Sequence, residues 1–213
     1  MKRTVNYAIL VMSCLLLANS HSMAQIDDHK FEVGGVFTSI TLSDFKARAL
    51  PTIASGDSTV RGLGGRFGYN FTDNFGNEAE GNFFPETHLG NEEFGQKLQG
   101  FLGVKAGVKN RWAGAFAKAR PGVMWFGDFS SQGTCTGFTF GSSCHVSHEK
   151  DFAMDVGGIA EFYPTERAII RVDVGDTIVR YPERTFGIFN NPSVLRAETK
   201  HNLQISVGFG WRF

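Results

Sequence analysis

Residues 145–149, His-Val-Ser-His-Glu, hold the side chains that come nearest to a chemical site in this sequence. A His-x-Ser pair on one strand face, with a carboxylate such as Glu161 nearby, could form a hydrolase triad in which Ser147 is the nucleophile and His145 the base. The two histidines with Glu149 could instead bind a divalent metal ion. No other ligand spacing supports a metal site, and histidines in a polar connection are usually solvated. We therefore expect no catalytic site, no metal site and no cofactor.

A second group of charged side chains is spread along the chain. Twelve of them occupy positions that alternate with apolar residues. If these positions share an enclosed face, opposite charges must pair there, because an unpaired buried charge is costly. The six acids and six bases balance, which predicts an interior charge network that plugs the fold; a path for ions or protons, as in a narrow porin-like pore, is the alternative. The acids are Glu32, Glu78, Glu80, Asp155, Glu161 and Asp173, and the bases are Arg66, Lys105, Lys118, Arg120, Arg171 and Arg212.

A period of two identifies the elements that carry these charges. A strand points successive side chains to opposite faces, and membrane-spanning barrels show segments of about ten residues with apolar residues outward and polar residues inward. Such segments cover residues 30–41, 60–71, 75–83, 98–108, 112–125, 152–162, 167–175 and 203–213. The last segment is the clearest, because its alternate positions are Leu203, Ile205, Val207, Phe209, Trp211 and Phe213. The pattern predicts an all-β fold, an eight-stranded antiparallel up-and-down transmembrane β-barrel.

The connections between these segments alternate in length. Those at 43–59, 85–96, 126–150 and 181–198 are long, whereas those at 72–74, 110–111 and 164–166 are short. Outer-membrane barrels have short periplasmic turns and long external loops, which places both chain ends in the periplasm. Aromatic residues favour the membrane interface, and they gather at the short-turn ends of the strands. We expect these to form a periplasmic aromatic girdle with the end of the last strand: Phe31, Tyr69, Phe71, Phe75, Trp112, Phe162 and Tyr163.

The N-terminus predicts export. Residues 1–24 combine Lys2 and Arg3, an apolar stretch and a Ser-Met-Ala ending, as a secretory signal peptide does, so the mature domain would cover 25–213. A membrane anchor and lipoprotein processing at Cys14 are the alternatives. In the exported chain the remaining pair, Cys135 and Cys144, predicts one disulfide bond in the third long connection.

Composition limits the other classes of function. The formal net charge is zero, which gives no argument for a nucleic-acid partner. Glycine is abundant, with 26 residues in 213, and glycine disfavours helices. A soluble lipocalin-type carrier remains an alternative, since it is also an eight-stranded exported barrel, but its apolar face would line a ligand cavity. The aromatic ends and the terminal phenylalanine favour the membrane barrel.

Most of the mature chain, residues 30–213, resembles the small outer-membrane barrels of the outer-membrane protein A and X type. The alternation of the last segment, which ends at Phe213, looks like the signal by which the barrel assembly machinery recognises its clients. The resemblance implies a protein of the Gram-negative outer membrane that contacts lipid and has a structural role or binds an extracellular ligand through its loops. The pair His145 and Ser147 is similar to that of lipid A deacylase, itself a barrel, which keeps a hydrolase as an alternative.

Overall fold

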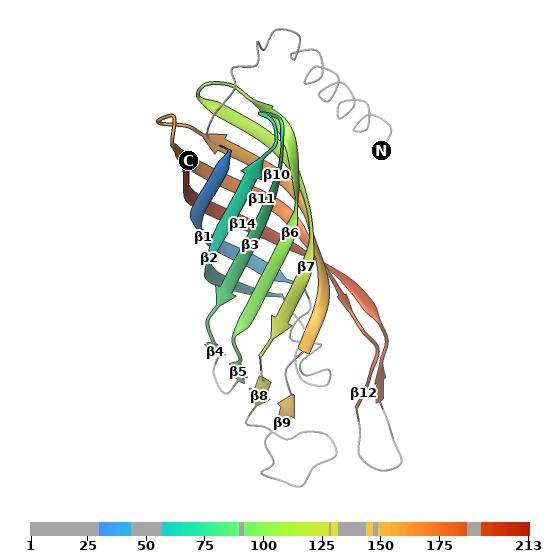
Figure 1. The fold of residues 1–213 in the computed structure, drawn as a ribbon. Helices are drawn as coiled ribbons and strands as arrows, with labels where there is room; N and C mark the ends of the chain where they lie inside the picture. Colours follow the sequence, from blue (N-terminus) through green and yellow to red (C-terminus); the bar gives the residue numbers. More distant parts are fainter. Residues whose placement is uncertain are drawn as a thin grey trace, which may run out of the picture.

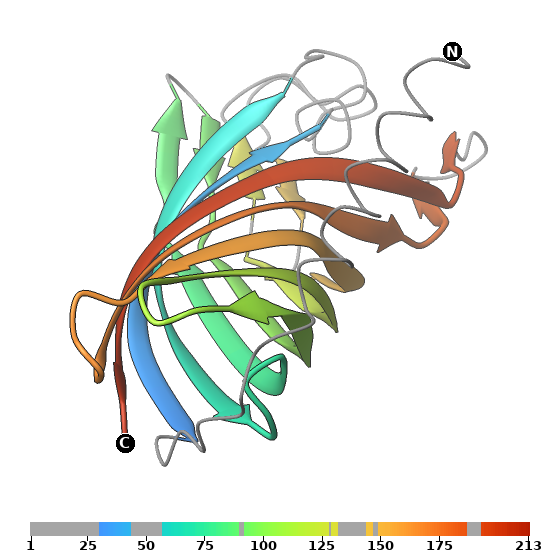
Figure 2. The same ribbon diagram turned by 90° about the horizontal axis from the view of Figure 1, so that it is seen from above.

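Eight long antiparallel strands close into a barrel in the computed structural model of the protein, as Figure 1 and Figure 2 show. The structure describes residues 30–43, 57–89, 92–127, 129–131, 144–146, 149–186 and 193–213. Neighbours around the barrel follow the order β1-β14-β11-β10-β7-β6-β3-β2. The predicted eight-stranded up-and-down barrel is thus confirmed. Its strands are β1 (Phe31–Leu42), β2 (Ser58–Asn70), β3 (Phe75–Phe84), β6 (Lys97–Lys109), β7 (Ala113–Phe126), β10 (Glu149–Phe162), β11 (Ala168–Tyr181) and β14 (Glu198–Arg212).

The barrel closes where the first strand meets the last. β1 pairs with β14, and Phe31 and Phe213 exchange two backbone hydrogen bonds of 3.0 Å each. Both strand ends therefore lie at the end of the barrel that carries the short turns. Side chains fix these turns: Thr72 Oγ1 accepts from the Phe75 amide at 3.1 Å, and Asn110 Oδ1 accepts from the Ala113 amide at 2.9 Å. Such bonds are typical of turn residues.

At the opposite end the strands continue further than the sequence predicted, and the long connections carry small sheets of their own (Figure 1). A four-stranded sheet with the order β4-β5-β8-β9 joins the second and third long connections. A separate hairpin in the fourth connection pairs β12 with β13. Strands of three residues are too short for a periodic pattern, so the sequence could not show them. They are β4 (Thr87–Leu89), β5 (Glu92–Phe94), β8 (Phe129–Ser131), β9 (Cys144–Val146), β12 (Arg184–Phe186) and β13 (Ser193–Leu195).

The two faces of the barrel wall differ sharply in polarity. Exposed large apolar side chains point outward on seven of the eight barrel strands, and Leu63 on β2 is 67% exposed. Most charged side chains of the barrel strands point inward and are buried. This arrangement is the opposite of what a lipocalin-type carrier requires. The described residues include no helix that is long and apolar enough to cross a membrane.

Candidate functional site: the barrel interior

The inward positions of the strands bring the predicted interior charges together. β3 shows how, because Glu78, Glu80, Asn82 and Phe84 are its successive inward side chains towards the long loops and all four are buried. The interior therefore changes along the barrel axis from charged to uncharged polar to apolar. All twelve predicted residues are buried: Glu32, Arg66, Glu78, Glu80, Lys105, Lys118, Arg120, Asp155, Glu161, Arg171, Asp173 and Arg212.

A first group of ion pairs, the lower cluster of Glu32, Lys105, Glu161 and Arg212, lies near the short turns. Lys105 Nζ bridges two acids, at 3.0 Å from Glu32 and 3.1 Å from Glu161. Arg212 contacts the same two acids, at 3.1 Å and 3.6 Å. Each charge in this cluster thus has at least two opposite partners, and Glu161 has a third in Arg171, at 3.4 Å.

Tyr163 completes the lower cluster and is not part of the outer aromatic girdle, where the sequence placed it. Its side chain is buried, its hydroxyl donates to Glu161 Oε2 at 2.8 Å, and the Arg212 guanidinium lies 4.1 Å from its ring centre. The odd positions of β10 face inward, and Tyr163 continues that order past the strand end. Burial, together with the neighbouring Glu161 carboxylate, raises the pKa of Tyr163 well above its usual value.

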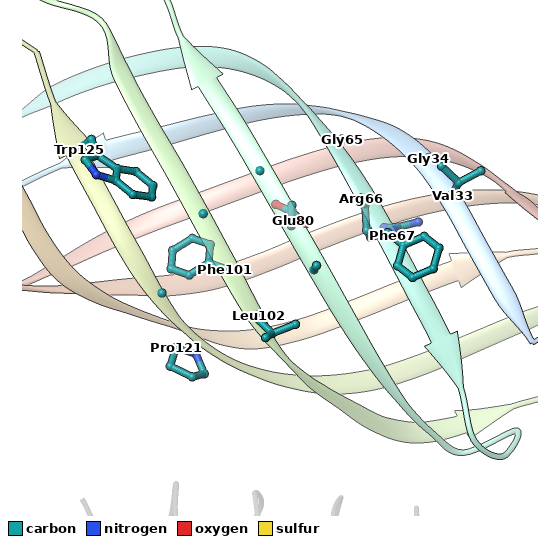
Figure 3. Close-up of a pocket in the computed structure, with 14 residues that line it drawn as sticks. Val33, Gly34, Gly65, Arg66, Phe67, Glu80, Phe101, Leu102, Pro121 and Trp125 are labelled. Atoms are coloured by element: carbon teal, nitrogen blue, oxygen red, sulfur yellow. The ribbon is translucent and has the colours of Figure 1, made fainter.

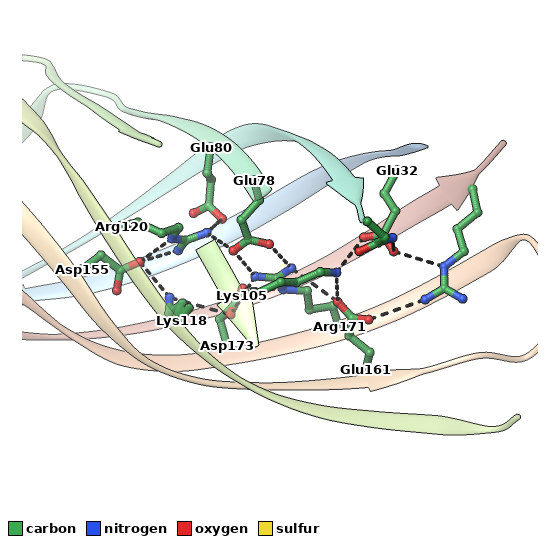
Figure 4. A network of polar contacts seen from close by, with 12 residues as sticks. Glu32, Glu78, Glu80, Lys105, Lys118, Arg120, Asp155, Glu161, Arg171 and Asp173 are labelled. Carbon is green, nitrogen blue, oxygen red and sulfur yellow. Dashed lines mark hydrogen bonds and ion pairs between the residues drawn. The ribbon is translucent and has the colours of Figure 1, made fainter. Parts of the chain in front are cut away.

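The central cluster, one step further from the turns, is built on two buried arginines (Figure 4). Arg171 makes a two-bond contact with Glu78, at 2.7 and 2.8 Å. It makes a second one with Asp173, at 2.9 and 3.1 Å. Paired bonds of this kind fix a carboxylate in both distance and orientation.

Arg120 joins Arg171 through a shared carboxylate. Its Nη1 atom lies 2.8 Å from Glu78 and 2.8 Å from Glu80, while Nε donates to Asp155 at 2.8 Å. Lys118 also contacts Asp155, at 2.8 Å. The central cluster is therefore continuous: Glu78, Glu80, Lys118, Arg120, Asp155, Arg171 and Asp173.

Arg66 is the exception among the predicted charges. Its side chain is 4% exposed, yet Nε and Nη1 have no hydrogen-bond partner in the described part of the chain. It stands directly opposite Glu80 on the neighbouring strand, but Glu80 is held by Arg120 instead. Two nitrogens of this buried guanidinium thus face no acceptor among the residues that the structure describes.

Above the ion pairs lies an uncharged polar layer. Gln99 donates to Gln204 at 2.9 Å, Thr177 donates to the same Gln204 oxygen, and the Thr38 and Ser206 hydroxyls lie 2.9 Å apart. The sequence did not single out these residues, because amides and hydroxyls carry no charge pattern. Lys97 and Asp151 were also missed: both are buried, and both stand immediately outside the predicted segments.

An apolar cluster fills the interior at the long-loop end. Ten buried residues from seven of the eight barrel strands form it. Two buried charged residues border it: Lys97 is the cross-strand partner of Phe84 and Phe126, and Asp151 is that of Met124. The members are Ile40, Leu42, Val60, Phe84, Phe101, Met124, Phe126, Ala153, Val179 and Tyr181.

The outward positions at the short-turn end carry the aromatic girdle without Tyr163. Ring contacts link Phe31 to Tyr69 at 5.0 Å, Tyr69 to Phe71 at 5.0 Å, and Phe71 to Phe75 at 5.6 Å. The last strand adds Phe213, whose ring lies 5.9 Å from that of Phe31. Trp112 and Phe162 are also half exposed at this end. The predicted outward residues of the last strand and the chain end are about half exposed along their whole length: Leu203, Ile205, Val207, Phe209, Trp211 and Phe213.

Several predicted features lie outside the described residues. They are the signal peptide at 1–24, Cys135 and Ser147, so the disulfide bond with Cys144 and the hydrolase pair with His145 stay predictions. Within the described residues, no group of histidine, cysteine and acidic side chains could hold a metal ion.

Comparison with known proteins identifies the family. The model of the outer membrane protein beta-barrel domain matches residues 10–213. The chain belongs to this family. It is therefore an outer-membrane β-barrel protein, as the sequence predicted. A search of curated proteins finds no match.

A search of solved structures finds other small outer-membrane barrels that are similar to this chain. Neisserial surface protein A superposes with a TM-score of 0.51 at 11% identity, covering 86% of this chain and 97% of that one. Ail of Yersinia pestis gives a TM-score of 0.49 at 15% identity, with the same two coverages. The N-terminal barrel of OprF from Pseudomonas aeruginosa gives 0.46 at 12% identity, covering 87% and 98%. At 11% identity, the likeness to Neisserial surface protein A supports the fold alone.

Proposed function

We propose that the protein is a closed, non-enzymatic barrel of the Gram-negative outer membrane that stabilises the membrane and presents its external loops for binding. The observation that carries this proposal is the filled interior. An eight-stranded barrel is only wide enough for its own side chains, and here ion pairs, an amide layer and an apolar cluster follow one another along the axis. An ion that entered would have to pass the apolar side chains of this cluster, which resist its passage.

The loop sheet supports the binding part of the proposal. β5 from the second long connection pairs with β8 from the third, so two external loops form one small sheet. Function in barrel proteins often lies on loops held by a rigid scaffold. Two loop variants test this role. In one, a short Gly-Ser turn replaces residues 129–146; in the control, the same turn replaces residues 187–192 of the fourth connection.

Two measurements test the closed barrel and its loops. In planar bilayers we expect no ion conductance from the refolded wild type, and steady open-channel steps would contradict the plug. Cells that display the wild type are then compared on a panel of extracellular-matrix proteins and glycans. We expect the 129–146 replacement to lose the bound partner while it still assembles, whereas the control replacement keeps it. Equal binding by wild type and 129–146 replacement would contradict the loop role.

The hydrolase alternative has a direct test. Because we propose no enzymatic role, His145→Ala and Ser147→Ala should leave the lipid A of the host membrane unchanged, as seen by mass spectrometry of extracted lipid. Deacylated lipid A that depends on the wild-type protein and disappears with either substitution would establish the enzyme instead.

A further inference from the structure

The outward face of the barrel turns from apolar to cationic at the external ends of β10 and β11. Phe152 on β10 is 55% exposed to lipid, and the next outward residue is Lys150. Arg180 on β11 is the cross-strand partner of Phe152. Lys150 and Arg180 are therefore diagonal neighbours, roughly 7–8 Å apart between backbone positions. Both are exposed, and neither makes an ion pair or hydrogen bond with any residue that the structure describes.

An acid on the same outward face of β11 is already engaged. Asp176 contacts His201 Nδ1 through one oxygen and accepts the Asn202 amide at 3.0 Å through the other. Both carboxylate oxygens of Asp176 are thus occupied by residues of β14. Among the residues that the structure describes, Lys150 and Arg180 thus have no ion-pair partner, at the level where external headgroups begin.

A groove crosses the outward face beside these cations. It has a volume of about 670 Å³ and runs over β1, β2, β3, β6 and β7 (Figure 3). Phe67, Leu102 and Trp125 stand in its walls. Pro121, which interrupts the β6–β7 pairing because proline has no amide hydrogen, also lines it.

Glycines form the floor of this groove, although packing within the protein does not demand them. Gly65, Gly81 and Gly100 line it and are successive cross-strand partners, and Gly35 on β1 continues their row beyond the lining. A Cβ atom on Gly65 would meet only the Gly34 carbonyl at 3.9 Å, and one on Gly81 would meet only the Gln99 carbonyl at 3.9 Å. These positions could therefore hold larger residues, and their glycines keep the lipid-facing surface hollow.

The groove descends from the cations into the membrane. Gly35 stands four residues from Phe31, the short-turn end of β1, whereas Gly100 stands nine residues from Lys109, the short-turn end of β6. The row of glycines therefore rises towards the external side from β1 to β6, as rows across tilted strands do. Its upper end is Trp125, which is the direct cross-strand partner of Lys150.

We propose that this face binds one phosphorylated lipid of the outer leaflet, with a phosphate on Lys150 and Arg180 and an acyl chain in the groove below Trp125. Three features match that occupant. Cations at the membrane surface attract anionic headgroups, and tryptophan favours the interface between them and the chains. Water is absent at the depth of the groove, so hydrocarbon must fill it. The site is independent of the loop sheet.

The test is native mass spectrometry of the refolded full mature chain in neutral micelles, titrated with bisphosphorylated lipid A. We expect Lys150→Gln with Arg180→Gln to bind it about 30-fold more weakly, from the usual contribution of two surface cations. Arg61→Gln is the matched control, because Arg61 is an exposed outward cation on β2, four places from β10 in the closed barrel. It should bind like the wild type.

The groove has its own variant, in which Gly65→Leu and Gly81→Leu fill the floor without an internal clash. We expect weaker lipid A binding and unchanged heat-modifiable migration. Equal binding by wild type and the Lys150–Arg180 variant, or an equal loss in Arg61→Gln, would overturn the proposal. So would equal affinity for dephosphorylated lipid A, or displacement by an equal concentration of inorganic phosphate, which would indicate a free-anion site. A wild-type dimer that the leucines dissociate would assign the groove to a second copy.

Discussion

Replacement of Arg171 by methionine tests whether the interior ion pairs hold the barrel together. The Arg171 side chain is fully buried and makes two-bond contacts with Glu78 and Asp173. Methionine keeps an unbranched apolar stem but removes the charge and five possible donors. Removing one partner of a buried ion pair leaves an uncompensated charge and costs about 3–5 kcal/mol.

The surviving contacts place the expected loss near the lower end of that range. Without Arg171, Glu78 keeps the Arg120 contact at 2.8 Å, and Asp173 keeps Lys118 at the longer distance of 3.7 Å. Asp173 is therefore the acid left with the weakest neutralisation. We expect Arg171→Met to lower the free energy of unfolding by about 3 kcal/mol.

Arg66→Met is the matched control for this measurement. It is the same substitution at another buried, inward-facing arginine, but Nε and Nη1 of Arg66 have no hydrogen-bond partner among the described residues. Removal breaks no direct contact and removes a desolvated charge, so we expect a change within about 1 kcal/mol of wild type, in either direction.

Urea unfolding from lipid vesicles, followed by the fluorescence of the tryptophans, gives both values. Trp112 and Trp211 face outward and report loss of the lipid environment. The reasoning is refuted if Arg66→Met destabilises the barrel as much as Arg171→Met, or if Arg171→Met stays within about 1 kcal/mol of wild type. Either result would mean that direct ion pairs do not determine stability here.

Three further predictions use other parts of the barrel. Deletion of Phe213 removes two backbone hydrogen bonds to Phe31, and cell fractionation should show that the protein fails to reach the outer membrane; normal arrival would contradict the assembly-signal role. Tyr163→Phe removes the 2.8 Å bond to Glu161 and should cost about 1–2 kcal/mol in the same urea assay, whereas no loss would show that the bond is dispensable. Met124→Ala in the apolar cluster should cost about 2–5 kcal/mol without producing conductance in planar bilayers, since the ion pairs still fill the interior; channel steps would show that the apolar cluster alone is the plug.

Much of the barrel could be predicted from the sequence because apolar and polar residues alternate with the same two-residue period in every long strand. Alternation alone assigned every long strand and the buried positions of residues as far apart as Glu32 and Arg212. It could not assign partners, since pairing across the interior depends on barrel closure and strand stagger. Arg171, for example, contacts Glu78 across 93 positions of sequence. Nor could it show that Nε and Nη1 of Arg66 have no hydrogen-bond partner in the described part of the chain.

The alternation of outward apolar and inward polar residues changes along the strands, which explains why the apolar cluster could not be predicted from the sequence. In β1 the apolar residues Val33 and Phe37 point outward, whereas Val36, Ile40 and Leu42 point inward. The apolar residues of β1 thus change from the outward to the inward face between Val36 and Ile40. A uniform pattern, with apolar residues outward and polar residues inward along the whole strand, predicts no apolar interior at the long-loop end.

This inversion has a physical cause in the two solvents that surround one barrel. Where lipid surrounds the wall, apolar residues are needed outside, and paired charges can occupy the inside. Where water surrounds it, polar residues such as Thr41 face outward and the interior becomes an ordinary apolar core. The alternation also breaks up any run of about 20 apolar residues, the length at which a segment spans a membrane as a helix. The interior charges thus keep the exported chain free of such runs before the barrel closes around them.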